Sequence, residues 1–211
     1  MQGLDASHEC SNVATKIRQA GLGFVGRYYS HSAWKNLSAG EAQILCSAGL
    51  KLVAVWESAG DSYGFFSRTQ GLDDVTSACS MATKIGQPPG TPIYFAVDFD
   101  ASAQQVSAAI HDYFLGLQAG MALVSQGNGG YYKIGAYGSG FVCDWLYTRQ
   151  LVSHTWLACS SGWTGSQNYS GWSIKQSTPS DNLGLGFSVD PDEALGDYGG
   201  FSVPVTAPAV A

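Results

Sequence analysis

The feature that most constrains this chain is an alternation of short apolar segments with stretches of helical periodicity over its first 150 residues. Each apolar segment has the length of a buried strand, and the helical stretches carry apolar residues three or four positions apart. This alternation is typical of strands that run parallel around a common core and are covered by helices. Strands are expected at residues 3–5, 24–29, 52–56, 93–97 and 134–137, with a helix after each.

After residue 150 the pattern changes, because three further strand-like segments follow one another without any helical period between them. Eight strands in all predict an α/β fold, an irregular (β/α) TIM-type barrel in which helices are missing after the last strands. An open doubly wound sheet is the alternative, although no G-x-G-x-x-G motif follows the first strand. We expect a single barrel domain over residues 1–200 and a flexible C-terminal tail over residues 201–211. The three late strands are expected at residues 155–158, 172–176 and 187–190.

Two helices begin with the spacing of a capping box, in which a serine and a side chain three residues later satisfy free backbone amides. Ser38 with Glu41 has this spacing before the second helix, and Ser102 with Gln105 has it before the longest one. Both boxes fix where a helix starts after a strand, and so place the end of that strand.

The charge balance excludes several partners. The 211 residues carry 10 Lys and Arg against 16 Asp and Glu, a net charge of −6, which gives no basic field for nucleic acid or anionic lipid. No apolar run is long enough to span a membrane, and the N-terminus lacks the features of a signal peptide. We expect a monomer that binds neither nucleic acid nor membrane.

The five cysteines are scattered and show no zinc-binding spacing. Small buried apolar residues are one interpretation of them, and a disulfide between Cys46 and Cys79 is the other. No phosphate-binding loop or EF-hand loop is present, so no cofactor and no metal are expected.

Carboxylates gather at the expected ends of the strands, although only 12% of the residues are charged. In a parallel barrel these ends meet at one face, which holds the active site. Several acids close together raise the pKa of at least one, which then donates a proton near neutral pH, as glycoside hydrolysis requires. Asp98 and Asp100 are two apart, so an extended strand would point them the same way. The side chains expected at strand ends are Asp5, Arg27, Tyr29, Glu57, Asp98, Asp100, Tyr137, Gln176 and Asp190.

Structural roles for these acids remain an alternative. An aspartate such as Asp100, just before Ser102, is also a common helix cap, and other acids could pair with Arg27. Serine-hydrolase chemistry fits less well, because Ser139 lacks the first glycine of a G-x-S-x-G elbow.

Short motifs along the chain resemble those of a known enzyme family. Residues 3–7 (GLDAS) are similar to the opening of the Chalaropsis-type lysozymes, the family 25 glycoside hydrolases, and residues 93–100 (IYFAVDFD) to their D-x-E strand. The match is closer to a related bacterial family, the Rv2525c-like glycoside-hydrolase-like domains, and covers residues 3 to about 195. Arg27-Tyr28, Leu37 with Glu41 and residues 136–139 are similar to further motifs of this bacterial family. Residues 156–158, 175–177 and Val189-Asp190 resemble further segments of the lysozymes.

The resemblance implies a lysozyme-like glycosidase that acts on a β-linked amino-sugar glycan such as peptidoglycan, at the cell wall or outside the cell. It implies an acid at Asp100 or Glu57, with Asp98 orienting the substrate or stabilising positive charge, and Asp5 shaping the site. The lysozymes carry Glu where this chain has the shorter Asp100, which supports a non-catalytic glycan-binding module as the alternative. A different hydrolase or lyase on the same barrel is a third possibility. Expected substrate-binding residues are Arg27, Tyr29, Tyr137, Trp156, Gln176 and Asp190.

Overall fold

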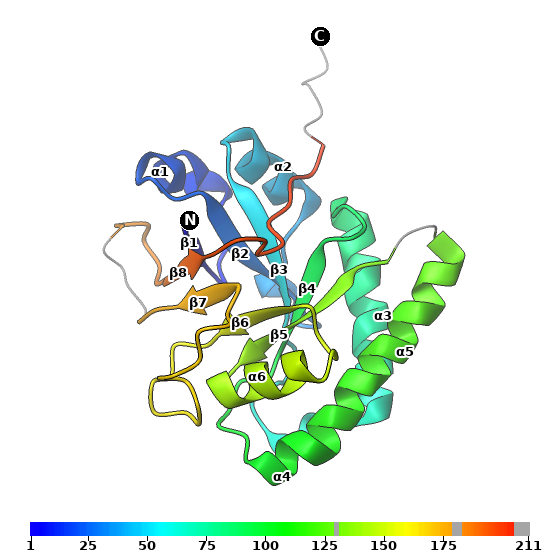
Figure 1. Cartoon of the computed structure of the whole chain (residues 1–211). Helices are drawn as coiled ribbons and strands as arrows, with labels where there is room; N and C mark the ends of the chain where they lie inside the picture. The colour runs from blue at the N-terminus through cyan, green and yellow to red at the C-terminus, as the bar shows by residue number, and fades with distance from the viewer. Residues whose placement is uncertain (129–130, 179–182, 205–211) are drawn as a thin grey trace.

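The computed structural model describes residues 1–128, 131–178 and 183–204. Within them, eight strands pair in chain order and close into a barrel (Figure 1). This confirms the barrel predicted from the sequence. The strands are β1 (Gln2–Asp5), β2 (Phe24–Tyr29), β3 (Lys51–Trp56), β4 (Pro92–Ala96), β5 (Lys133–Gly138), β6 (His154–Leu157), β7 (Ile174–Gln176) and β8 (Asp190–Ala194).

Helices follow each of the first five strands, and in the described residues none lies between β6 and β8. Ser102 and Gln105 form the expected capping box, which opens the long helical segment after β4. The α-helices are α1 (Ala14–Gln19), α2 (Ala39–Ser47), α3 (Arg68–Ile85), α4 (Ala103–Gln105), α5 (His111–Asn128) and α6 (Gly140–Thr148). Shorter turns are η1 (Ser11–Val13), η2 (Ala33–Lys35), η3 (Tyr63–Phe65) and the π-helical η4 (Val106–Ile110).

Strand β8 departs from the sequence prediction in position and direction. It begins at Asp190, where the predicted strand ended, and it runs antiparallel to both neighbours, β1 and β7. The segment holds two aspartates, a proline and a glutamate, so it lacks the apolar pattern by which strands are recognised. Because the strand is reversed, its first residue, Asp190, pairs with the last residue of β1, Asp5. Asp190 therefore still lies at the end of the barrel where the parallel strands end.

The barrel interior is filled by alternate residues of the strands, as the two-residue period requires. On β2, Phe24 belongs to the interior cluster and Tyr28 packs against it, whereas Val25 and Tyr29 belong to the outer core under the helices. Gly26 also faces inward, where a Cβ atom would lie 2.6 Å from the Trp156 ring. The interior cluster consists of Phe24, Val53, Val55, Tyr94, Ala96, Trp156, Ile174 and Ala194.

The C-terminal segment packs on the barrel beyond the predicted domain boundary. Phe201 and Val203 are buried, and Phe201 exchanges backbone hydrogen bonds with Leu52 of β3. The expected tail therefore does not begin at residue 201, and residues 205–211 of that tail lie outside the described residues.

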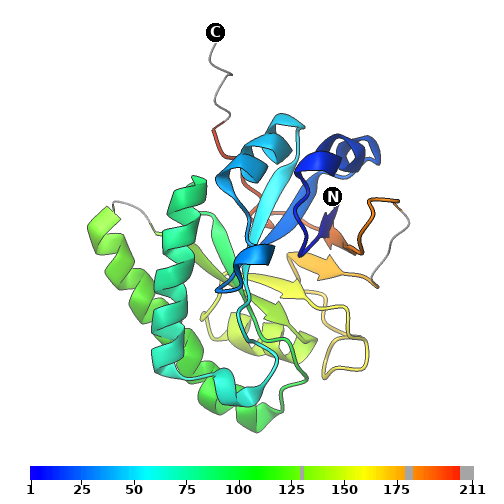
Figure 2. The ribbon, with the colours of Figure 1, turned by 180° about the vertical axis from the view of Figure 1, so that it is seen from behind.

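Helices α3 and α5 lie side by side (Figure 2) and approach so closely that glycines are needed between them. A Cβ atom on Gly71 would overlap the backbone carbonyl oxygen of Tyr113. We therefore expect Gly71→Ala to lower the free energy of unfolding by about 1–3 kcal/mol, since a rigid backbone must move. Denaturant unfolding measures this, with Gly64→Ala as control, because a Cβ there meets nothing within 4 Å. Equal stability of the two variants would show that the helices separate freely.

Candidate active site

The side chains that continue the interior rows of the strands gather at one mouth of the barrel. This mouth is the end of the barrel where the parallel strands end. Four carboxyl groups lie close to the phenol of Tyr137 there, and the negative charge of each acts on it. Burial raises the pKa of Tyr137 far above its ordinary value, and these four acids raise it further. The four acids are Asp98, Asp5, Glu57 and Asp190.

A hydrogen-bonded chain fixes Asp5 in the floor of this mouth. The Tyr137 hydroxyl donates to Oε1 of Gln176 at 2.9 Å, and Nε2 of Gln176 donates to Oδ2 of Asp5 at 2.8 Å. The Tyr28 hydroxyl donates to the other oxygen of Asp5 at 3.1 Å. Both oxygens of Asp5 thus have donors, one from β2 and one from β7, which sets the orientation of its carboxyl group.

Asp5 and Asp192 form a buried pair of carboxyl groups. Burial raises the pKa of Asp5 to about 7, with Asp190 adding to the rise, and Asp192 hydrogen-bonds to it. Burial, and then the charge of Asp5, also raises the pKa of Asp192 well above its ordinary value. Trp156 Nε1 donates to Oδ1 of Asp192 at 3.0 Å, whereas Oδ2 of Asp192 is buried without a donor. Ionised carboxylates only accept hydrogen bonds, so one proton held between Asp5 and Asp192 satisfies this oxygen.

The shared proton gives a test in Asp192→Asn. The amide removes the titratable Asp192 carboxyl, whose own pKa is raised well above its ordinary value, whereas Asp5 should keep a raised pKa because burial is the main cause of its rise. The raised pKa values of this pair contribute stability that is fully present below about pH 4 and is lost as pH rises through about 7, the pKa of Asp5. Asp192→Asn should flatten this loss.

Carboxyl NMR titration of Asp5, together with unfolding between pH 4 and 8, measures both effects. The exposed Asp112→Asn is the matched control, because its carboxyl group lies on a helix surface. A pH dependence of stability that is unchanged in Asp192→Asn would show that Asp192 holds no proton in the folded protein.

Asp98 and Glu57 differ in their surroundings. Burial raises the pKa of Asp98 to about 6, and the charges of Glu57 and Asp61 raise it further, against the opposing effect of Lys35. Glu57 instead forms an ion pair with Lys35, whose Nζ lies 2.7 Å from Oε1. Lys35 also lies 4.9 Å above the ring of Tyr28. Asp98 can thus hold a proton near neutral pH, whereas Glu57 is ion-paired. Acid–base catalysis uses such a pair of neighbouring carboxyl groups.

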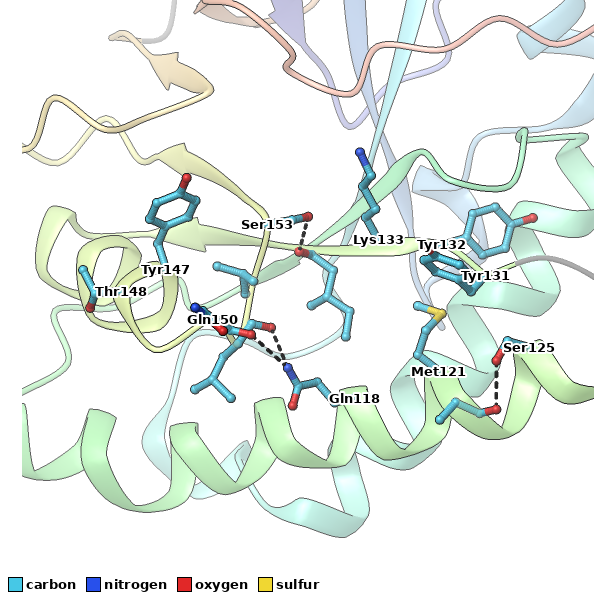
Figure 3. Close-up of a pocket in the computed structure, with 14 residues that line it drawn as sticks. Gln118, Met121, Ser125, Tyr131, Tyr132, Lys133, Tyr147, Thr148, Gln150 and Ser153 are labelled. Atoms are coloured by element: carbon cyan, nitrogen blue, oxygen red, sulfur yellow. Dashed lines mark hydrogen bonds between the residues drawn. The ribbon is translucent and has the colours of Figure 1, made fainter.

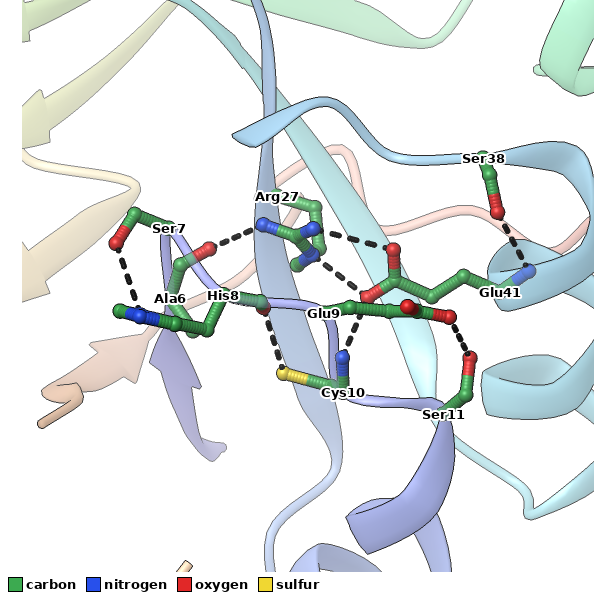
Figure 4. Close-up of polar contacts among 9 residues, drawn as sticks. All are labelled: Ala6, Ser7, His8, Glu9, Cys10, Ser11, Arg27, Ser38 and Glu41. Atoms are coloured by element: carbon green, nitrogen blue, oxygen red, sulfur yellow. Dashed lines mark hydrogen bonds and ion pairs between the residues drawn. The ribbon is translucent and has the colours of Figure 1, made fainter. Parts of the chain in front are cut away.

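Two expected substrate-binding residues lie outside the mouth. Arg27 and Tyr29 occupy the outward positions of β2, opposite in phase to Tyr28. Arg27 is fully buried between the barrel and α2, where its Nε donates to Glu41 Oε1 at 2.7 Å (Figure 4). The Tyr29 hydroxyl donates to Oε1 of Gln87 at 2.9 Å. Contrary to the sequence prediction, neither side chain is placed to contact a substrate.

Glu41 explains why the first capping box is incomplete. Ser38 caps α2 as expected, accepting from the Glu41 backbone amide at 3.1 Å. The Glu41 carboxylate does not return this bond. It binds Arg27 through both oxygens and also accepts from the backbone amide of Cys10 at 2.8 Å (Figure 4).

Asp100 and Trp156 also differ from the expectation. Strand β4 ends at Ala96, so strand alternation does not extend to Asp100, which is exposed and accepts from the Thr164 backbone amide at 2.8 Å. Trp156 is buried in the floor, where Tyr94 and Tyr137 pack edge-to-face with it. Gln176 and Tyr137 do reach the mouth, and they bind each other there.

Sequence reasoning missed Tyr28, Asp192 and Lys35. Tyr28 could have been found from its spacing to Phe24, and Asp192 from its spacing to Asp190, since both pairs share an inward face. Lys35 lies in the turn η2, where no periodic signal exists.

A groove of about 830 Å³ lies at the opposite end of the barrel, between α5, the start of β5 and the segment after α6 (Figure 3). Gln118, Lys133 and Gln150 line it, and none of the candidate acids does.

All five cysteines are free. In residues 1–128, 131–178 and 183–204, no group of three or more His, Cys, Asp or Glu side chains could hold a metal ion. No helix of the described part of the chain has the length and apolar character needed to cross a membrane.

The sequence profile of the Rv2525c-like, glycoside hydrolase-like domain matches residues 15–192, a range that includes most of the barrel and the site's acids from Glu57 to Asp192. The chain belongs to this family. Among curated proteins it is similar to YbfG of Bacillus subtilis (strain 168), an uncharacterized protein, with 31% identity over 177 residues, 77% of this chain and 24% of that protein. The chain spans about a quarter of the length of the curated relatives it matches.

Several solved structures share the barrel. The Tat-secreted protein Rv2525c of Mycobacterium tuberculosis, in complex with L-tartrate, superposes with a TM-score of 0.76 at 23% identity, covering 94% of this chain and 98% of that chain. The autolysin LytC of Streptococcus pneumoniae, with a synthetic peptidoglycan ligand, gives 0.58 at 17% identity, covering 90% and 46%. The bacterial lysozyme of Streptomyces coelicolor gives 0.53 at 16% identity, covering 93% and 92%. These likenesses establish the fold that the lysozyme motifs implied.

Proposed function

We propose that this domain is a glycoside hydrolase that cleaves a β-linked amino-sugar glycan such as peptidoglycan. The observation that carries the proposal is Asp98, a partly buried carboxyl group with a pKa of about 6, next to the ion-paired Glu57 at the barrel mouth. Membership in a glycoside hydrolase-like family supports it, as do barrels of the same fold in a lysozyme and in an autolysin bound to a peptidoglycan ligand. The Tat-secreted relative supports action outside the cell.

In this mechanism Asp98 donates a proton to the leaving glycosidic oxygen. The Glu57 carboxylate, held by Lys35, stabilises the positive charge that develops on the sugar. A water molecule then adds to the anomeric carbon and gives its proton to the Asp98 carboxylate, which restores the acid. Tyr137 keeps its proton, because burial and the surrounding acids raise its pKa. Its hydroxyl is anchored on Gln176 and so supports the floor beneath the sugar.

A non-catalytic glycan-binding module is the second candidate. Asp100 favours it, because this residue stands where the lysozyme motif carries its acid, yet it is exposed and bound to the Thr164 backbone amide. An acid held in this way has a structural task, and in this case the site would bind glycan without cleaving it.

Incubation with purified peptidoglycan and with chitin oligomers tests the proposal, with new reducing ends detected by mass spectrometry. A glycosidase produces shortened oligomers that increase with time and are absent when the protein is heat-denatured. Binding of these glycans without any new reducing end would favour the binding module.

A further inference from the structure

An exposed tryptophan lies beside the candidate active site. Trp34, in η2, is 68% exposed, the highest value among the large apolar side chains of the described residues. An indole buries a large apolar area when it packs, so leaving it in water forgoes substantial stabilisation. Its neighbour in sequence is Lys35, which pairs with Glu57 of the mouth.

Two further rings extend this exposed surface. The His8 ring lies 5.2 Å from the Phe187 ring at an interplanar angle of 18°, a stacked arrangement. Its edge contact with Trp34 has a centroid distance of 6.1 Å and an angle of 65°. His8 is exposed, and Phe187 is partly buried against the outer core. The three rings form one connected aromatic surface from segments far apart in the sequence.

The three segments converge at the same end of the barrel. His8 follows the C-terminal end of β1, and Trp34 follows that of β2. Phe187 precedes Asp190, the first residue of the reversed strand β8, which pairs with Asp5 at that end. The rings therefore form one side of the rim around the carboxylates, and a polymer bound at the carboxylates can extend over them.

We propose that His8, Trp34 and Phe187 form an aromatic platform that binds one pyranose ring of a β-linked glycan, a subsite away from the bond that is cleaved. The apolar C–H face of a pyranose stacks on an aromatic ring, and its hydroxyl groups remain available to polar neighbours such as Lys35 and Ser7. The occupant rests on the function proposed above, whereas the position of the platform rests on geometry alone.

Single substitutions on the platform test this. Trp34→Ala is expected to weaken the binding of a chitin hexamer about tenfold, because the ring face is lost, and Trp34→Phe to restore most of the affinity. Phe187→Ala removes the ring on which His8 stacks and should weaken binding in the same direction. Tyr147→Ala is the matched control, since this exposed ring lies in α6 and lines the groove at the other end of the barrel.

Isothermal titration measures affinity, and kinetics on long and short oligomers separate KM from kcat. A platform raises KM for long oligomers in Trp34→Ala and leaves kcat, and cleavage of the shortest substrate, near the parent values. Equal binding by the parent, Trp34→Ala and Tyr147→Ala, with cleavage intact, overturns the platform and leaves the proposed glycosidase standing. Lost binding in Trp34→Ala without cleavage by the parent supports the platform and contradicts the glycosidase. A parent that neither binds nor cleaves glycan contradicts both.

Discussion

Asp98→Asn is expected to lower the rate of glycan cleavage by about 10²- to 10⁴-fold, the contribution typical of a positioned general acid. The amide has nearly the shape of the carboxyl group, so the fold and glycan affinity should persist while the transferable proton is lost. The parent should also lose activity as pH rises through about 6, where Asp98 ionises, and the variant should lack this limb. Initial rates on peptidoglycan across pH 4 to 8, with binding measured in parallel, check these effects.

Asp100 provides the control for Asp98, because it belongs to the same motif and differs in its environment. It is exposed and bound to a backbone amide, so Asp100→Asn should lower the rate far less than Asp98→Asn. Asp100→Glu, which restores the lysozyme pattern, should then give no gain. Abolished cleavage in Asp100→Asn, or increased cleavage in Asp100→Glu, would assign the acid to Asp100 instead. No turnover in the parent or in any of these variants would favour the binding module.

The barrel was predictable because its signals are local and periodic. The β2 strand was predicted at its observed bounds, since Phe24–Tyr29 is rich in apolar and aromatic residues and is interrupted only by Gly26 and Arg27. The position predicted for β8 was a few residues too early in the sequence. Its acids and proline give no apolar strand pattern, and its direction depends on pairing with β1 and β7. That displacement hid Asp192, the partner of Asp5.

Site residues could be predicted only where a chemically suitable side chain also lies on the side of the strand that faces the site. Asp5 and Asp98 were identified because acids follow apolar strands there. Arg27 was assigned to the wrong face, since proximity to a strand end does not determine on which side of the sheet a side chain lies. The raised pKa values of Asp5 and Asp192 depend on burial and on long-range pairing, neither of which a spacing rule contains.

Removing one partner of the buried pair between Arg27 and Glu41 is expected to destabilise the fold strongly. Both side chains are almost fully buried, with Nε 2.7 Å from Oε1. Arg27→Met would leave the Glu41 carboxylate buried beside a single backbone donor, that of Cys10. We expect the free energy of unfolding to fall by about 3–5 kcal/mol, the cost of an unpaired buried charge. Denaturant unfolding measures it, with Lys133→Met as control, because the Lys133–Asp197 pair is exposed and should contribute less than about 1 kcal/mol.

The double variant Arg27→Met/Glu41→Leu separates a structural role of Arg27 from a role in substrate binding. Replacing both charges removes the desolvation cost together with the attraction, so much of the lost stability should return. If Arg27 only joins α2 to the barrel, the refolded double variant keeps the glycan affinity and cleavage rate of the parent. A double variant that regains stability but no longer binds glycan would restore Arg27 to the substrate site, which would require the Arg27 side chain to turn through the sheet toward the mouth.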